Sequence, residues 1–472
     1  MKALNYIKIT GSLFLLAVVI ASCTVGKKYQ RPELNLPESF TSENIADSNS
    51  VADLGWREFF TDTSLQRLIE SGLQYNQDLL VAVKRMDIAQ RQLLQARKLN
   101  LPEAELNIVG SISRPSDNSL NGVSLGAFLG QRYLENYNAA INFSWEADIW
   151  GKLRGQKEKA LAAYLQTGEA ARAVQTRLIA EIAQGYFNLL MLDRQLEITK
   201  RNLILNDSFY VATRMLMEAG MSNALAVQQA AAQKQNTALL IPEIEMSIAM
   251  QENTLQLLTG QWPGAVSRVA ASDFRFATAL NTGLPVGIVA RRPDVRAAEF
   301  ALQIANAEVG VAQANMYPAL NITAGGGLES FKASNWFNIP GSLFGLATGG
   351  IAQPLFKRRA LKTRFEVSKL EREQAVIQFR QSVLQATTEV HNALVQVEKL
   401  NEQETIAADQ VSTLRNAVSD AQQLFRSDMA IYLEVITAQA NALQAELNQA
   451  SIHRRQLAAV VELYRALGGG AK

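Results

Sequence analysis

The pattern of apolar and polar positions predicts a chain built from helices and strands in two similar halves. Apolar and small residues recur at helical spacing through 293–316, and Pro318 then ends the helix. Pro293 suits the first helical position, where its missing N–H needs no partner, and Asp294 lies near the positive end of the helix dipole. The same pattern occurs earlier in the chain without a gap, at an offset that aligns Pro102 with Pro318. So long a period does not fit a solenoid and indicates a duplicated half-molecule.

Alternation of apolar and polar residues predicts three strands, and a weaker strand is predicted after the third, so that each half has two. They lie at 104–112, 138–146, 319–328 and 343–353. The connecting stretches 113–136 and 329–342 are predicted to be loops. The first strand pair has one apolar and one polar face, which fits either contact with lipid or a hairpin packed on a soluble core. Four strands cannot close a membrane barrel, which needs about eight, so strands in a membrane require several chains, and three would supply twelve.

Long helices complete each half. Residues 355–467 contain no Gly or Pro, and a heptad register runs through the first part of this stretch. Only Glu404 breaks the register, whose other members are Val376, Phe379, Val383, Ala386, Val390, Ala393, Val397, Leu400, Ala407, Val411, Leu414, Val418, Ala421 and Phe425. A second register spans 433–461, which predicts an antiparallel coiled-coil hairpin with a turn near 428. A similar offset between the halves aligns this turn with one near 220.

These patterns divide the chain into six segments. They are a signal peptide at 1–22, an N-terminal segment at 23–63, a first structural half at 64–259, an inter-half linker at 260–290, a second structural half at 291–467 and a C-terminal tail at 468–472. The N-terminal segment is predicted to lie against the body of the protein through Trp56, Phe59 and Phe60. Ser64 is predicted to cap the helix that follows.

Composition argues against several classes of function. The 46 basic and 44 acidic residues give a net charge of +2, which does not indicate a nucleic-acid partner. The two histidines, His391 and His453, are too far apart in sequence to indicate a metal site. No nucleophile–base pair and no phosphate-binding loop occurs, so we expect no enzyme, no catalytic residue and no cofactor.

The N-terminus has the pattern of a bacterial lipoprotein. Lys2 and Lys8 are followed by a mostly apolar run, Ile9–Ala21, which is too short to span a membrane and is typical of a signal peptide. Ile20-Ala21-Ser22-Cys23 resembles a lipobox, which implies that Cys23, the only cysteine, becomes the lipid-modified first residue. Several acyl chains, palmitate among them, would anchor the chain stably. The alternative is an ordinary secretory signal with a chance cysteine.

Five motifs occur in order along essentially the whole mature chain. They are Tyr29, Pro32, Pro37 and Phe40 after the lipobox; Trp145-Glu146-Ala147-Asp148-Ile149-Trp150-Gly151; Arg291-Arg292-Pro293-Asp294-Val295 with Ala298 and Glu299; Asn306-Ala307 with Gly310; and Tyr432-Leu433-Glu434-Val435 with Ala438 and Gln439. Together they resemble the TolC-like outer-membrane efflux channels, in the lipoprotein branch that serves resistance-nodulation-division pumps.

This resemblance implies a mainly α-helical fold with transmembrane β structure. Three chains would form a homotrimer, with a twelve-stranded barrel in the outer membrane of a Gram-negative bacterium and a tunnel of coiled-coil helices in the periplasm. It further implies a periplasmic adaptor (membrane fusion) protein and an inner-membrane resistance-nodulation-division pump as partners, outer-membrane lipid around the barrel, and a role in multidrug resistance. The exported substrate is not predicted, because selection lies mainly in the pump.

The resemblance also points to a periplasmic gate at the start of the last helix. Leu433 matches the position of a leucine ring, and an apolar ring can gate by dewetting; the alternative is a leucine in the heptad core. Thr437 stands where the family often has an aspartate, so this chain departs from the usual acidic ring. Glu434 or Asp428 offers a carboxylate instead, and the alternative for each is an ordinary solvated side chain.

The two turns are the expected adaptor contacts, with a plain hairpin turn as the alternative. Their residues are Gly220, Met221 and Ser222 in the first half and Asp428, Met429 and Ala430 in the second. Met215 and Met217 lie close to Met221, and thioether ligands for copper or silver are a weaker reading than apolar packing.

Two functions remain open from the sequence. The first is a passive outer-membrane exit duct of a tripartite efflux system. The second is a lipid-anchored periplasmic coiled-coil scaffold without channel activity, which requires the four strands to be soluble.

Overall fold

The structure of the chain is a computed structural model that describes residues 25–34, 54–269 and 291–471. Cys23 and the greater part of the predicted linker lie outside the described residues. The described chain forms two compact units. The strand unit contains 87–165, 300–377 and the described residues up to Pro32, and the hairpin unit contains the others. Within the described ranges, no helix has the length and apolar character needed to cross a membrane.

Four long helices run from one unit into the other. They are α4 (Gln77–Ala96), α6 (Lys152–Glu218), α9 (Pro293–Ala314) and α10 (Ala360–Arg426). Pro293 begins α9, as predicted, and α9 ends at Ala314, four residues before Pro318.

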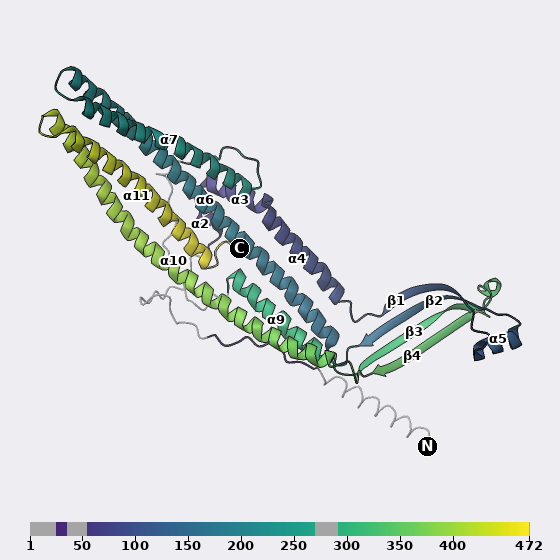
Figure 1. The fold of residues 1–472 in the computed structure, drawn as a ribbon. Coiled ribbons are helices and arrows are strands. Elements are labelled where there is room, and N and C mark those ends of the chain that lie inside the picture. The colour runs from purple at the N-terminus through teal and green to yellow at the C-terminus, as the bar shows by residue number, and fades with distance from the viewer. Residues whose placement is uncertain (1–24, 35–53, 270–290, 472) are drawn as a thin grey trace. The chain divides into compact units, whose positions relative to one another are not determined.

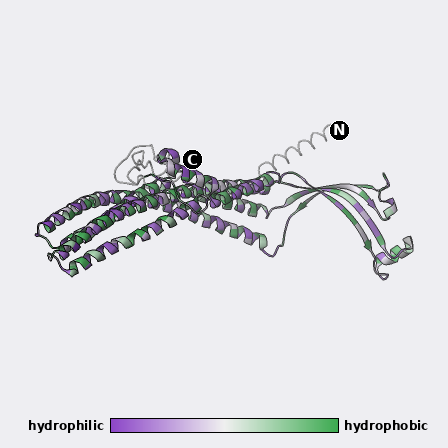
Figure 2. Cartoon of the chain, turned by 90° about the horizontal axis from the view of Figure 1, so that it is seen from above, coloured by the Kyte–Doolittle hydropathy of each residue, from purple (hydrophilic) through white to green (hydrophobic). Residues whose placement is uncertain are grey.

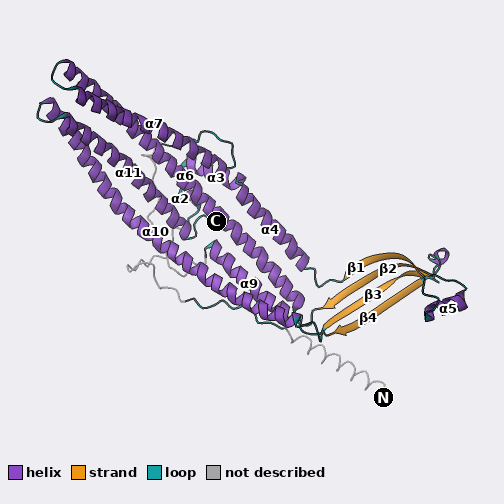
Figure 3. Cartoon of the chain, in the orientation of Figure 1, coloured by secondary structure: helices purple, strands orange, loops and turns teal. Residues whose placement is uncertain are grey.

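The strand unit contains one antiparallel sheet in the order β1-β2-β3-β4 (Figures 1 and 3). Its strands are β1 (Glu103–Ser113), β2 (Leu134–Ala147), β3 (Ala319–Ser330) and β4 (Leu343–Ala352). All four predicted strands are confirmed, and the largest boundary difference is the start of β2, at Leu134 and not 138. The central pairing of β2 with β3 joins the two halves of the chain.

Pairing across the sheet places most of the large apolar residues of the four strands on one face, because residues opposite each other share a face. That face carries Leu106, Ile108, Ile141, Phe143, Ile322 and Ile351. The other face carries Glu105, Asn107, Asn142, Asn321, Thr323 and Thr348. Val109, Phe344 and Leu346 also lie on the other face. The alternation of hydrophobic and hydrophilic residues along the strands is visible in Figure 2.

The described residues of the chain cover neither face of this sheet. Of the residues in the four strands, only Ala140 is buried. The outer edges of β1 and β4 have no strand partner within the sheet. A hairpin packed on a soluble core would bury one face, so that alternative is wrong.

The predicted loop at 113–136 is only partly a loop. It contains α5 (Leu120–Leu129), whose N-cap Ser119 accepts a hydrogen bond from the Gly122 N–H at 3.1 Å. The second predicted loop, 329–342, holds only the last residues of β3 and the short 3-10 turn η3 (Ala333–Asn335).

The hairpin unit contains the predicted pair of helical hairpins. In the first, α6 turns into α7 (Ala224–Leu258), and in the second, α10 turns into α11 (Tyr432–Ala466). Every member of the first heptad register is buried or half-buried, which confirms the predicted packing of α10. In the second register Leu433 is an exception, because it is exposed and Val435 takes the buried position.

The last described part of the N-terminal segment packs into the core of the hairpin unit, as predicted. Trp56 and Phe59 lie in α2 (Trp56–Phe59), and both are buried together with Phe60. The ring of Phe59 stacks on that of Tyr464 in α11, with ring centroids 4.0 Å apart.

The prediction that Ser64 caps the next helix is wrong. The N-cap of α3 (Thr63–Tyr75) is Asp62, whose carboxylate accepts from the backbone N–H groups of Ser64 and Leu65. A second hydrogen bond holds Asp62 in the N-cap position, because its carboxylate also accepts a hydrogen bond from the Tyr186 hydroxyl at 2.7 Å.

Glu404, which breaks the heptad pattern, lies half-buried on α10. Its Oε1 is 3.4 Å from the Gln449 side-chain nitrogen, and its Oε2 is buried without a hydrogen-bond partner. Burial raises the pKa of Glu404 above its usual value, although nearby His453 and Gln449 act in the opposite direction. The carboxylate therefore lowers the stability of the fold at neutral pH.

Replacement of this carboxylate by an apolar side chain is expected to stabilise the protein. Glu404→Leu should raise the free energy of unfolding by about 1 kcal/mol at pH 7, because it removes the desolvation of a charge. Because the folded-state pKa of Glu404 is raised, the destabilisation by its carboxylate disappears as the pH falls through that pKa. The gain in stability from Glu404→Leu should therefore shrink in acid. Denaturant unfolding in detergent, at neutral and acidic pH, measures both effects. A Glu404→Leu variant that is less stable at pH 7 would contradict this account.

Candidate functional site

The first hairpin tip lies at the end of α6, where a left-handed glycine ends the helix. Gly220 has φ +72°. Its N–H donates to the Met217 carbonyl at 2.9 Å, and the Met221 N–H donates to the Leu216 carbonyl at 2.8 Å. This pair of bonds is a Schellman motif, which satisfies carbonyls that the end of the helix leaves free.

The second tip repeats this motif in the other half of the chain with a less suitable residue. Asp428 occupies the position of Gly220 with φ +60°, and its N–H donates to the Phe425 carbonyl at 3.2 Å. The Met429 N–H donates to the Leu424 carbonyl at 2.9 Å. A non-glycine residue in this conformation costs roughly 1–2 kcal/mol. The equivalence confirms both predicted turns and shows that the second is the more strained.

Both tips expose apolar side chains. In the first tip these are Met221 and Leu225, and in the second they are Met429, Ile431 and Leu433. Large apolar side chains gathered at an exposed turn mark a contact surface more often than isolated ones do. The predicted contact residues therefore lie where a partner protein can reach them.

The three predicted gate residues lie on the exposed side of the first turns of α11. Leu433 is 48% exposed, so the alternative of a core leucine within this chain is wrong. Glu434 accepts a hydrogen bond from the Ile431 N–H at 3.0 Å and so stabilises the start of α11. Thr437 is exposed as well. The structure therefore brings Leu433 and Thr437 to one surface and gives Glu434 a local structural role.

Behind the tips, the two hairpins contact each other through aromatic and apolar side chains. Phe209 of α6 and Phe425 of α10 lie with ring centroids 5.4 Å apart. Phe209 also belongs to a buried cluster with Ala230 of α7 and Val435 of α11. The four helices are thus packed together close to the predicted gate.

Further from the tips, one buried carboxylate joins helices of both hairpins. Glu446 of α11 accepts from Arg201 of α6 and from Arg415 of α10, each at 2.6 Å. Asn202 contacts the same carboxylate at 3.3 Å. Glu446 was not predicted from the sequence. The one feature that could have indicated it is its position as an acidic residue among the alanines and leucines of α11.

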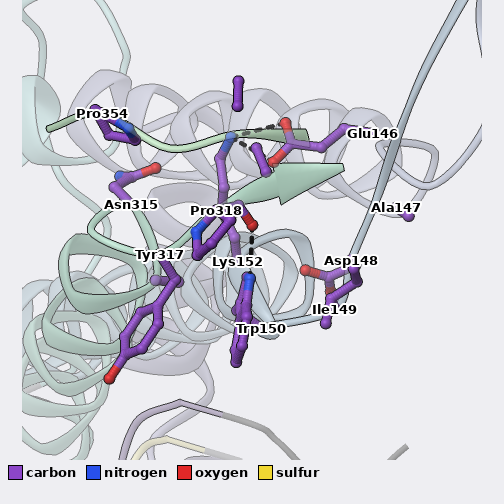
Figure 4. A pocket seen from close by; sticks show the side chains of 13 residues that line it. Glu146, Ala147, Asp148, Ile149, Trp150, Lys152, Asn315, Tyr317, Pro318 and Pro354 are labelled. Atoms are coloured by element: carbon purple, nitrogen blue, oxygen red, sulfur yellow. Dashed lines mark hydrogen bonds and ion pairs between the residues drawn. The ribbon is translucent and has the colours of Figure 1, made fainter. Parts of the chain in front are cut away.

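In the strand unit, the motif from Trp145 to Gly151 forms the corner between β2 and α6. Figure 4 shows its members from Glu146 to Trp150. The Trp150 ring nitrogen donates to the Pro318 carbonyl at 2.7 Å, and the Trp150 ring stacks on Tyr317. Lys152 bonds both carboxylate oxygens of Glu146, at 2.8 and 2.9 Å. This corner surrounds a small pocket of about 130 Å³. Lys152 and Trp150 both have partners within the chain, so the role of this corner is structural.

The fold and these sites together define the class of protein. A model of the outer membrane efflux protein family matches residues 68–261 and 284–469. The chain belongs to this family, and it is an outer-membrane component of efflux, with the duplicated halves and the exit-duct role that the sequence predicted.

Individual relatives match over almost the entire chain. The cation efflux system protein CusC of Escherichia coli O6:H1 is 28% identical over 97% of this chain and 98% of its own length. The toluene efflux pump outer membrane protein TtgC of Pseudomonas putida is also 28% identical, over 97% of this chain and 95% of its own. The open-state crystal structure of the Neisseria gonorrhoeae MtrE outer membrane channel has a TM-score of 0.85 at 26% identity, over 95% and 99% of the two chains. CusC and TtgC are equally similar to this chain, and their names give different substrates, so the comparison assigns no substrate to this chain.

Proposed function

We propose that three copies of this chain form one passive channel, which completes a tripartite efflux system in the outer membrane. The observation that carries this proposal is the uncovered sheet, with one apolar face, one polar face and two unpaired edges. Within lipid, an open strand edge leaves backbone groups without partners, so β4 of one copy must pair with β1 of the next. The apolar face then contacts lipid and the polar face lines the passage.

The oligomer and the pore are tested on the purified full-length protein. Light scattering in detergent should give a trimer, and planar bilayers should show ion-conducting steps. A monomer that makes no pores would overturn the proposal. The scaffold alternative is separated by protease accessibility on intact cells, because only a membrane-spanning channel exposes 113–136 or 329–342 to the exterior.

A lipid on Cys23 would anchor the chain beside the sheet. The Val25 N–H donates to the Trp150 carbonyl at 3.2 Å, at the corner where β2 ends. Cys23 precedes Val25 by two residues in the sequence. The attached acyl chains would therefore enter the same membrane as the strands. Mass spectrometry of the mature N-terminus, with Cys23→Ser as the control, tests the modification.

The apolar tips are the proposed docking surface for a periplasmic adaptor protein, which would connect the channel to an inner-membrane resistance-nodulation-division pump. The double variant Met221→Glu/Met429→Glu is expected to weaken adaptor binding at least about tenfold, because it places charge in an apolar contact. Binding of the cognate adaptor to the reconstituted channel measures this effect. The variant Met221→Leu/Met429→Leu keeps the apolar surface and should bind as the wild type does. Unchanged binding by the glutamate variant would exclude the tips as the docking surface.

A further inference from the structure

The corner between β4 and α10 carries a group of exposed side chains that the channel function does not use. Leu355 is 81% exposed and Phe356 is 98% exposed, and the three exposed cations Lys357, Arg358 and Lys362 follow them closely in the chain. We call these five residues the basic corner. Together with neighbouring residues they line a cleft of about 430 Å³.

The cations of the basic corner lack acidic partners in the chain. Arg359, next to them, pairs with Glu366 at 3.2 Å. Lys357, Arg358 and Lys362 form no ion pair with any carboxylate among the described residues. Three like charges so close together in the chain repel one another unless an anion lies near them.

The corresponding corner of the first half is built differently. There, Lys152 is paired with Glu146, and Asp148 accepts from the first backbone N–H groups of α6 at 2.9 Å. The turn itself uses Gly151 with φ +77°. That corner supplies its own negative charge and needs no external anion.

The backbone of the basic corner is also unfavourable by itself. Arg358 and Arg359 have φ +48° and +64°, a region that glycine adopts readily and arginine does not. Outliers of this kind gather where a site depends on the resulting direction of the side chains. The turn therefore presents the cations at a local conformational cost.

From these observations we infer that the basic corner binds the phosphate of an anionic phospholipid in the periplasmic leaflet of the outer membrane. The inference rests on the proposed membrane-spanning sheet, because Ile351 on the apolar face of β4 lies only four residues before Leu355. Leu355 and Phe356 would insert among the acyl chains. Lys357, Arg358 and Lys362 would contact the phosphate, which is the usual division of labour at a membrane interface.

Native mass spectrometry of the full-length channel in detergent tests this assignment. The channel is titrated with phosphatidylglycerol and with phosphatidylcholine of identical acyl chains. We expect about tenfold tighter binding of phosphatidylglycerol, weakened by added salt. Lys357→Gln/Arg358→Gln/Lys362→Gln should remove this preference. Phe356→Ser should weaken the binding of both lipids and keep the preference for phosphatidylglycerol.

A control that removes two cations elsewhere is available on the same helix. Arg372 and Arg380 are exposed on α10 outside the basic corner, and Arg372→Gln/Arg380→Gln should leave the preference unchanged. Equal binding of the two lipids by the wild type would overturn the inference. Dissociation of the trimer by the triple substitution would also overturn it, because the corner would then be a contact between copies. Wild-type conductance reports separately on the channel, so pores without lipid preference would refute this inference alone.

Discussion

Leu433→Ser is expected to raise the conductance of the reconstituted channel by about an order of magnitude, since an apolar constriction excludes water and a hydroxyl-lined one does not. In the proposed trimer, threefold symmetry would place three copies of this side chain at one level of the passage. Because Leu433 is about half exposed and lies outside the buried cluster around Val435, its replacement should cost the fold little stability. Single-channel recording in planar bilayers, at fixed salt and voltage, measures the change.

The internal repeat provides a matched control for this experiment. Leu225 is the counterpart of Leu433 in the first half, is likewise the second residue of its helix and is 54% exposed. Leu225→Ser should leave the conductance near the wild-type value, because only the second tip resembles the family gate. An equal rise in both variants would contradict the assignment of the gate to Leu433. An unchanged conductance in Leu433→Ser would remove Leu433 from the gate altogether.

The regular elements could be predicted from the sequence because their residue patterns are strictly periodic. Alternation with a period of two located three of the four strands, since a shift of one residue would move every apolar side chain to the other face. The heptad register similarly fixed the buried side of α10. The repeat between the two halves located both turns, at Gly220 and at Asp428.

Features that depend on tertiary contacts could not be predicted from these residue patterns. Ser64 and Asp62 are both good N-cap residues, and the choice of Asp62 depends on Tyr186, which is distant in the sequence. Helix α5 was missed because glycines in an apolar run resemble a loop. The heptad register alone placed Leu433 in the core, although the helix begins one residue earlier and Val435 points inward instead.

The Arg-Pro-Asp motif shows the same limit, since the sequence explained its proline and aspartate but not its arginine. Arg292 is only 3% exposed, and its guanidinium bonds Asp294 at 2.6 Å and Glu389 of α10 at 2.8 Å. It also donates to the Ala466 carbonyl, at the end of α11, at 3.1 Å. One side chain thus ties the start of α9 to both helices of the second hairpin.

Arg292→Ala should therefore lower the free energy of unfolding by about 3–5 kcal/mol, the range for breaking a buried ion pair from one side. Arg292→Lys should recover only part of this loss, because an ammonium group cannot reproduce the forked geometry. Arg291→Ala is the control at the exposed neighbouring position, where a change below about 1 kcal/mol is expected. Denaturant unfolding of the detergent-solubilised protein gives all three values. Equal losses at the two arginines would show that burial of Arg292 does not matter.

The pH dependence of stability provides a second test of the same network. Burial alone would raise the pKa of Asp294 and of Glu389, but the hydrogen bonds and charge of Arg292, joined at Glu389 by those of Arg465, outweigh it and hold both pKa values below their usual range. Their stabilisation is therefore present above the unfolded-state values of about 4 and is lost as the pH falls through the lower folded-state values. The wild type should lose stability between about pH 5 and pH 3, and Arg292→Ala should lose less over that interval. Identical pH profiles would mean that Arg292 does not set the charge state of the two carboxylates.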